Sequence, residues 1–287
     1  MEKNAKRDKL SIESVKTKVI DVIDENKNGE IDIEDLIIKG LKTPGIRINR
    51  DSFLQKELFK LYPQETIDIA IKNNPMTANI PLEVIDKIAN ETINFERMCV
   101  SGISTVLGLP GGAAMIATIP ADIIQYYGYM LRAAQKLLYL YGFPEIFADD
   151  EGVNIDTGTI NILIICLGVM YGVAGAKNAL LAISKALGTG VRKKLIKAAL
   201  TKGTIYPIVK KVIDWFGVNL TKDLFATFFE KTIPVVGGVV GGAITFATFK
   251  PCCNKLKKSL RDTRFTNPNF VENKDIIEVE NIDDENE

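Results

Sequence analysis

Residues 24–35 place oxygen-bearing side chains at the spacing that a calcium-binding EF-hand loop requires. Such a loop draws its ligands from positions 1, 3, 5, 7, 9 and 12. These positions hold Asp24, Asn26, Asn28, Glu30 through its carbonyl, Asp32 and Asp35. Position 6, where the loop turns sharply, is Gly29, and position 8, which needs an apolar anchor, is Ile31. The spacing therefore predicts one Ca²⁺ site built only from oxygen ligands.

The expected affinity of this site is low. Positions 3 and 5 carry neutral asparagines, and position 12 carries Asp35, whose side chain is shorter than the usual glutamate. Because ligand charge and reach tune EF-hand affinity, we expect dissociation constants of about 10⁻⁵ to 10⁻³ M. The alternative interpretation of the same residues is a solvated acidic turn between two helices.

Apolar residues at helical spacing flank the loop on both sides. They are Ile12, Val15, Val19 and Val22 before it, and Leu36, Ile37 and Leu41 after it. This pattern predicts a helix on each side. We therefore expect residues 1–44 to form an EF-hand-like helix-loop-helix that ends before Gly45.

The rest of the chain predicts an all-α fold. Three stretches carry no charge: Met98–Ala121, Thr157–Ala176 and Thr232–Phe249. Each contains a G-x-x-x-G pattern, which lets helix backbones approach closely in lipid or in a tight protein core. We expect a compact multi-helix bundle of Gly-rich, close-packed hairpins over residues 45–264. Each stretch is also near the roughly 20 residues that cross a bilayer, so insertion of the hairpins is the alternative.

Charge is segregated along the chain although its total is zero, with 36 basic and 36 acidic residues. Between Thr157 and Ile213 there are basic residues and no acidic ones, and a second basic run covers residues 250–264. Basic residues beside apolar helices favour an anionic membrane surface as partner. Nucleic acid is not expected, because no reader motif is present. Residues 265–287 are predicted to be a disordered acidic tail.

Catalysis has no positive signal. The chain contains no histidine, which excludes histidine triads and histidine-ligated metals. It also lacks a phosphate-binding P-loop and a nucleophile elbow. Asp122 and Tyr126 are the one pair that could face a polar pocket, although a helix start and an interfacial aromatic explain them as well. We expect no enzyme activity.

The first residues contain no secretory signal, which predicts a cytoplasmic protein.

Several segments between about residues 51 and 262 resemble the EcsC family of bacterial proteins. F-L-Q-K-E-L at 53–58 and D-I-A-I-K-N-N-P at 68–75 fit its pattern, and three further segments are more distinctive. They are L-P-G-G-A-A-M-I-A-T-I-P-A-D-I at 109–123, Q-Y-Y-G-Y-M-L-R-A-A-Q-K-L-L-Y-L-Y-G at 125–142, and I-P-V-V-G-G-V-V-G-G at 233–242. The resemblance implies a helical, membrane-associated cytoplasmic protein, named for a neighbour of an ABC-transporter operon, and it carries no catalytic residues.

Together these features predict a calcium-binding, membrane-peripheral accessory or scaffold protein of the bacterial cytoplasm. The protein would be located at the inner face of the membrane as a peripheral protein, with envelope or transport machinery as a candidate partner. The alternative is an integral membrane protein, such as a channel-like or transport subunit. The oligomeric state is left open by the sequence.

Overall fold

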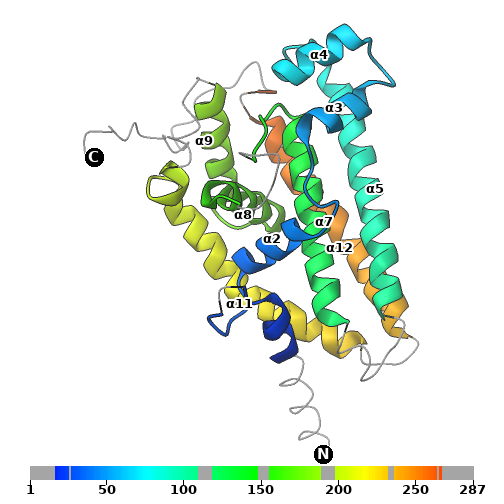
Figure 1. Ribbon diagram of the computed structural model, residues 1–287, viewed down its shortest axis with the longest axis vertical. Helices are drawn as coiled ribbons and strands as arrows, with labels where there is room; N and C mark the ends of the chain where they lie inside the picture. The colour runs from blue at the N-terminus through cyan, green and yellow to red at the C-terminus, as the bar shows by residue number, and fades with distance from the viewer. Residues whose placement is uncertain are drawn as a thin grey trace, which may run out of the picture.

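Helices are the only regular elements among the residues that the structure, a computed structural model, describes: 17–25, 27–108, 118–147, 155–188, 198–231, 236–263 and 265–266. The all-α prediction is therefore confirmed. A short helix at 17–23 precedes α2 (Ile33–Lys42), α3 (Arg50–Leu58), α4 (Gln64–Lys72), α5 (Leu82–Gly108), α7 (Ile119–Leu140), α8 (Thr157–Tyr171), α9 (Ala176–Gly188), α11 (Tyr206–Lys231) and α12 (Val236–Arg261). Figure 1 shows these helices gathered into one bundle.

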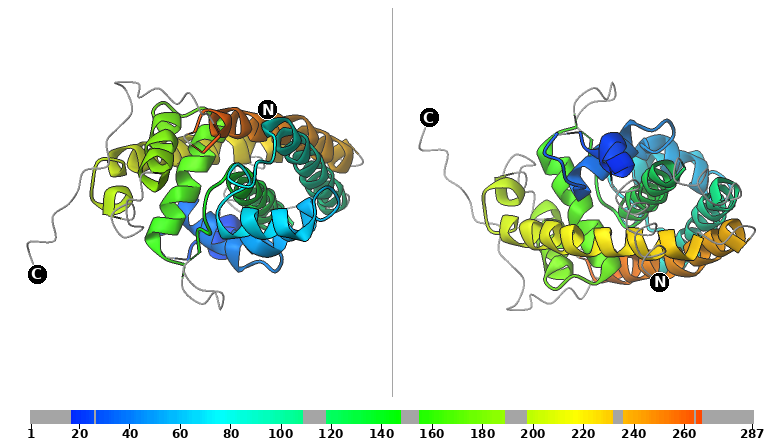
Figure 2. Two further views of the ribbon diagram at one scale, coloured as in Figure 1. Left: turned by 90° about the horizontal axis from the view of Figure 1, so that it is seen from above. Right: turned by 90° about the horizontal axis from the view of Figure 1, so that it is seen from below.

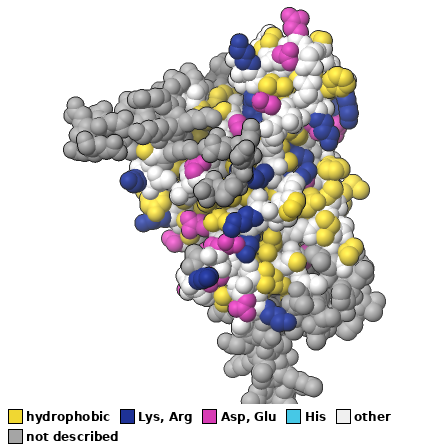
Figure 3. Space-filling view, viewed as in Figure 1, with side chains coloured by type: hydrophobic (Ala, Val, Ile, Leu, Met, Phe, Trp, Pro, Cys, Tyr) yellow, Lys and Arg dark blue, Asp and Glu magenta, His cyan; other side chains and the backbone are white. Residues whose placement is uncertain are grey.

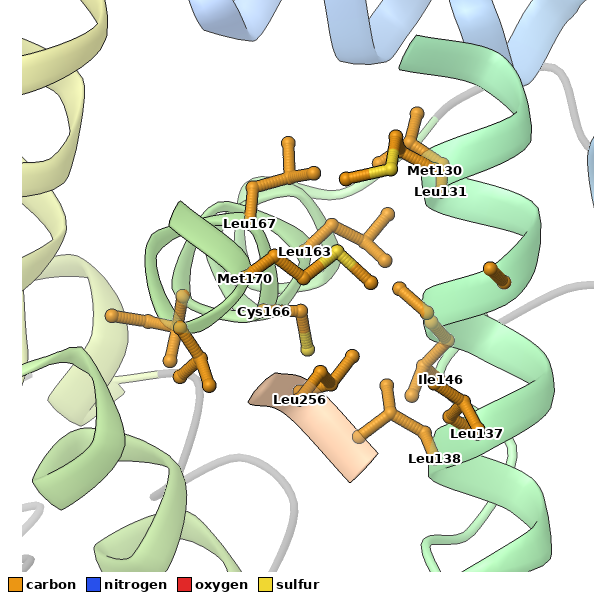
Figure 4. Packing of buried hydrophobic residues seen from close by; sticks show 14 of the residues in the cluster. Met130, Leu131, Leu137, Leu138, Ile146, Leu163, Cys166, Leu167, Met170 and Leu256 are labelled. Atoms are coloured by element: carbon orange, nitrogen blue, oxygen red, sulfur yellow. The ribbon is translucent and has the colours of Figure 1, made fainter. Parts of the chain in front are cut away.

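Helix α8 lies at the centre of the hydrophobic core. Of its 15 residues only Thr157, Ile162 and Tyr171 are not buried. Side chains of α8 meet those of α7 on one side and Leu256 of α12 on another (Figure 4). A helix surrounded in this way has no solvent-exposed face, which explains why its sequence carries no charge.

Two glycines fit α8 among its neighbours. A β-carbon on Gly168 would lie 2.7 Å from Cγ2 of Val212 and 3.0 Å from Cβ of Ala176, so side-chain-free backbone is required there. Gly172 ends the helix in the left-handed conformation, with φ of 79°. The G-x-x-x-G pattern therefore serves close packing at its first glycine and helix termination at its second.

Helices α5 and α12 lie side by side (Figure 2) and run in opposite directions (Figure 1). Polar pairs connect them at regular intervals: Asp86 with Arg261 at 3.3 Å, Asn90 with Lys257 at 2.6 Å, and Asn94 with Lys250 at 3.0 Å. Further along, a β-carbon on Gly242 would overlap the Thr105 side chain. The two backbones approach closely at this point, as the glycine pattern predicts. Helix α12 also contains Pro251, immediately after Lys250.

The opposite end of the bundle is held by the buried guanidinium of Arg50, at the start of α3. It donates to the carbonyls of Ala70 (3.2 Å), Ile71 (2.7 Å) and Asn73 (2.9 Å), at and after the C-terminal end of α4, and to that of Phe143 (3.1 Å). Carbonyls at a helix end lack intrahelical donors, and a cation there also offsets the helix dipole. Arg50 thereby fixes α4 onto the bundle.

Among the described residues no helix combines the length and the apolar composition that crossing a bilayer requires. The charge-free stretch 157–176, one of the three candidates for such a span, is divided between α8 and the start of α9 and lies in the core. Residues 109–117, which include Gly112, lie outside the described residues, as does the acidic segment from 267 onward.

Helix α2 of the EF-hand-like segment packs directly on the bundle. Ile33, Leu36 and Ile37 belong to the same buried cluster as α7 and α8. The crossing with α7 is close, because a β-carbon on Gly40 would lie 3.4 Å from Cα of Gly128 and 3.2 Å from Cδ1 of Leu131. The described part of residues 1–44 therefore shares one hydrophobic core with the helices that follow it.

Candidate calcium-binding loop

The first half of the loop turns around the carboxylate of Asp24. The backbone N–H of Gly29 donates to Oδ2 of Asp24 at 2.8 Å, and that of Asn28 donates to Oδ1 at 3.2 Å. Gly29 has φ of 81°, a conformation that costs glycine little and other residues more. The turn at position 6 thus forms as the EF-hand register predicts, and it fixes the position-1 carboxylate.

The second half of the loop is connected through the Asn28 amide. Its Nδ2 donates to Oδ2 of Asp32 at 2.7 Å, and its Oδ1 accepts from the backbone N–H of Glu30 at 2.8 Å. Asp32 is the N-cap residue of α2, and its carbonyl accepts from the N–H of Leu36 at 3.2 Å. Loop positions 5, 7 and 9 are therefore connected to one another by hydrogen bonds. Asn26, at position 3, lies outside the described residues.

Asp35, at position 12, is the unusual residue of the loop. Its side chain sits in the first turn of α2 and is only 2% exposed. Within the described part of the chain, its Oδ2 has no hydrogen-bond partner. Burial, followed by the negative charge of Asp32, raises the pKa of Asp35 to about 6. A buried carboxylate oxygen without a partner is costly, and an external cation would offset that cost.

Glu25, at loop position 2, contacts α2 instead of the loop interior. It forms ion pairs with Lys39 at 2.6 Å and Lys42 at 2.9 Å. Hydrogen bonds from these lysines lower the pKa of Glu25. Because its carboxylate is already paired with α2, Glu25 is not a ligand candidate, in agreement with the register.

The side chains of the loop offer the oxygen donors that calcium prefers, but their carboxylates do not lie together around one point. No three Asp, Glu or Cys side chains of the described residues lie close enough together to hold a metal. Three of the six expected ligands are not carboxylates, since positions 3 and 5 are asparagines and position 7 offers a backbone carbonyl. The oxygen-only donor set and the unpartnered oxygen of Asp35 suit a hard cation.

A buried charge cluster lies beyond the loop, and sequence reasoning missed it. Glu96 of α5 is fully buried and pairs with Arg132 at 3.0 Å and Lys136 at 2.5 Å, both on α7. The Arg132 guanidinium also donates to the carbonyl of Gly45, just after the EF-hand-like segment. One signal was available, because Glu96 falls on the same helical face as the apolar Ile93 and Val100. Breaking such a buried set is strongly destabilising, so its role is structural.

Asp122 and Tyr126, the alternative catalytic pair, are both engaged by neighbouring helices. Oγ of Ser104 donates to Oδ1 of Asp122 at 2.7 Å. The hydroxyl of Tyr126 lies 3.4 Å from Oγ1 of Thr248, and burial raises the pKa of Tyr126 to about 12. These contacts tie α7 to α5 and α12.

No protein-family model, curated protein or solved structure matches this chain. The resemblance to the EcsC family and the EF-hand register therefore stay predictions from the residues.

Proposed function

We propose that this chain is a calcium-binding, membrane-peripheral accessory protein of the bacterial cytoplasm, whose N-terminal loop takes up Ca²⁺ through Asp24, Asn26, Asn28, Glu30, Asp32 and Asp35. The observation that carries this proposal is the unpartnered, buried oxygen of Asp35, in a loop whose Asp24 carboxylate is already fixed by Gly29. The bacterial and cytoplasmic part follows from the resemblance to the EcsC family.

The geometry gives ion binding a means of affecting the rest of the molecule. Asp35 lies on α2, which packs on α7 at the Gly40–Gly128 crossing. A ligand that draws Asp35 towards Asp24 acts on the angle between the 17–23 helix and α2. A change in that angle would shift α2 relative to the bundle, so calcium binding would alter the packing of α2 on α7.

The charge distribution supports a membrane surface as the partner. Lys250 and Lys257 of α12 contact the amide oxygens of Asn94 and Asn90, so these contacts leave their positive charge unneutralised. Lys210 and Lys211 of α11 are exposed. Basic side chains near an anionic surface contribute about 1 kcal/mol each.

Calorimetric titration tests the ion site directly. We expect a saturable heat with a dissociation constant of about 10⁻⁵ to 10⁻³ M, abolished in Asp24→Ala. The matched control is Glu25→Gln, which removes a neighbouring carboxylate outside the ligand register and should leave the affinity within about threefold. Absence of any heat at millimolar calcium would overturn the proposal.

Protons give a second readout that depends on Asp35 itself. With a pKa of about 6, this carboxyl is largely protonated below pH 6, so calcium must displace a proton there. The measured heat at pH 6 should then depend on the ionisation enthalpy of the buffer, and this dependence should vanish at pH 8. Asp35→Asn should remove this dependence at pH 6.

Carbonate extraction of cell membranes separates the peripheral interpretation from the integral one. Release into the supernatant supports a peripheral protein, and retention in the pellet contradicts it.

A further inference from the structure

One end of the α5–α12 pair exposes large apolar side chains. Met98 and Val106 of α5 are 68% and 62% exposed, and Phe246 of α12 is 44% exposed. Hydrophobic side chains gather over α5 on the face shown in Figure 3. At this end α5 and α11 terminate and α7 and α12 begin, as Figure 1 shows. Side chains of this size are expected to be covered by a partner when they cluster on one face.

An open groove runs between the two helices at this end. It has a volume of about 400 Å³ and is lined by Met98, Gly102, Thr105, Gly242 and Phe246, among others. The Gly242–Thr105 contact forms its floor, because the glycine brings the two backbones together. The groove is shallow and apolar, which suits flexible hydrocarbon better than a rigid polar ligand.

The charge-free parts of α5 and α12 at this end have a defined length, and Asp122 of α7 lies against them, where it accepts from Ser104. Beyond Arg97, α5 carries no charged residue up to its end at Gly108, and α12 carries none from Val236 to Phe249. At about 1.5 Å per residue, residues 98–108 extend about 16 Å. This length matches one leaflet of a hydrocarbon core that is about 30 Å thick. It is half of what a crossing helix needs.

Basic side chains mark the boundary of the apolar end. The Arg97 guanidinium lies over the Phe246 ring at 3.8 Å, and its Nε has no hydrogen-bond partner in the described part of the chain. Lys250 of α12 donates to the neutral Asn94, which lies one turn before Arg97 on α5. Glu96, the adjacent acidic residue, is buried and paired with α7. The rim is therefore positive, which complements anionic lipid headgroups.

We propose that this end, residues 98–106 of α5 with residues 242–249 of α12, enters one leaflet of an anionic bilayer while Arg97 and Lys250 contact the lipid phosphates. This inference rests on the proposed membrane-peripheral function and names the surface that performs it. A second copy of the chain is the less suitable occupant, because a two-fold contact would bring the same positive rim against itself.

Vesicle flotation of the full chain tests the inference, with phosphatidylcholine vesicles that contain phosphatidylglycerol. The double variant Met98→Asp/Val106→Asp should bind about tenfold or more weakly, because aspartate is costly in hydrocarbon. The matched control is Phe59→Asp, since Phe59 is also 68% exposed but lies next to α3 at the opposite end. Its binding should equal that of the unaltered chain.

A second variant tests the rim without altering the apolar surface. Arg97→Gln/Lys250→Gln should weaken binding by roughly fivefold per charge, and the difference should shrink in high salt. Circular dichroism of each variant confirms that the helices are retained.

Each result has a definite meaning. If the unaltered chain floats and Met98→Asp/Val106→Asp floats equally well, the membrane function stands and this docking end is wrong. If the unaltered chain does not float with or without calcium, the membrane part of the proposed function fails together with the inference. If sedimentation shows a dimer that Met98→Asp/Val106→Asp dissolves, the surface joins two copies, which also overturns the inference.

Discussion

Helix α8 and the facing ends of α5 and α12 share one sequence property and have opposite surroundings. Both lack charge over many consecutive residues. Helix α8 is enclosed by α7, α9, α11 and α12, whereas Met98, Val106 and Phe246 face outward. A charge-free sequence shows only that a segment avoids water. Whether protein or another apolar phase covers it depends on how many helices the fold places around it.

The largest expected effect contrasts truncations in the two regions. Leu163→Ala in α8 should lower the free energy of unfolding by about 3 kcal/mol, because it leaves a cavity in a closely packed core. Met98→Ala should change it by less than about 0.5 kcal/mol. Urea denaturation monitored by circular dichroism measures both. Equal losses would show that Met98 is covered in solution and would break the contrast.

Asp35 tests the same contrast with a polar group, because it is buried like α8 while its Oδ2 has no hydrogen-bond partner in the described part of the chain. Its pKa of about 6 lies above its ordinary value of 3.8, so the folded state holds its proton more tightly than the unfolded state. The free energy of unfolding should therefore fall as pH rises from about 4 to 6, by about 3 kcal/mol in all. Asp35→Asn should remove this slope in calcium-free denaturation curves, and a slope that persists would assign it to another group.

The α5–α12 contact should resist enlargement although it lies beside the exposed groove. A β-carbon on Gly242 would overlap Thr105 and lie 3.1 Å from the carbonyl of Ser101. Gly242→Ala should therefore lower the free energy of unfolding by about 1–2 kcal/mol. Adding Thr105→Ala should recover part of this loss, as a thermal-unfolding double-mutant cycle would measure. Additive effects would mean that the two residues do not meet.

The smallest expected effect is a gain of stability. Gly102 is exposed in the C-terminal part of α5, and a β-carbon there would meet nothing within 4 Å. Gly102→Ala should raise the free energy of unfolding by about 0.5–1 kcal/mol through helix propensity. Destabilisation in the same thermal measurement would indicate that another surface rests on this position in solution.

The fold class and the loop turn were accessible from the sequence because both depend on local rules. Helical periodicity predicts the helices, and the placement of Gly29 predicts the turn that orients Asp24. Burial was not accessible, because it depends on neighbours distant in sequence. The sequence indicates that Asp35 is a ligand on the loop surface. Its burial follows only from the packing of the neighbouring Leu36 and Ile37 on the bundle. Glu96 likewise finds Arg132 and Lys136 only after α5 and α7 are paired.

Pro251 gives α12 two halves with different mechanical freedom. Proline supplies no N–H, so the carbonyl four residues earlier, at Ala247, loses its helical donor, and bending there breaks one hydrogen bond fewer than elsewhere. The half after Pro251 is held to α5 by Lys257 and Arg261. The half before it carries the apolar residues. Bending of α12 is therefore easiest at the boundary between its apolar and basic parts, and both parts remain in contact with α5, the first at Gly242 and Lys250 and the second at Lys257 and Arg261.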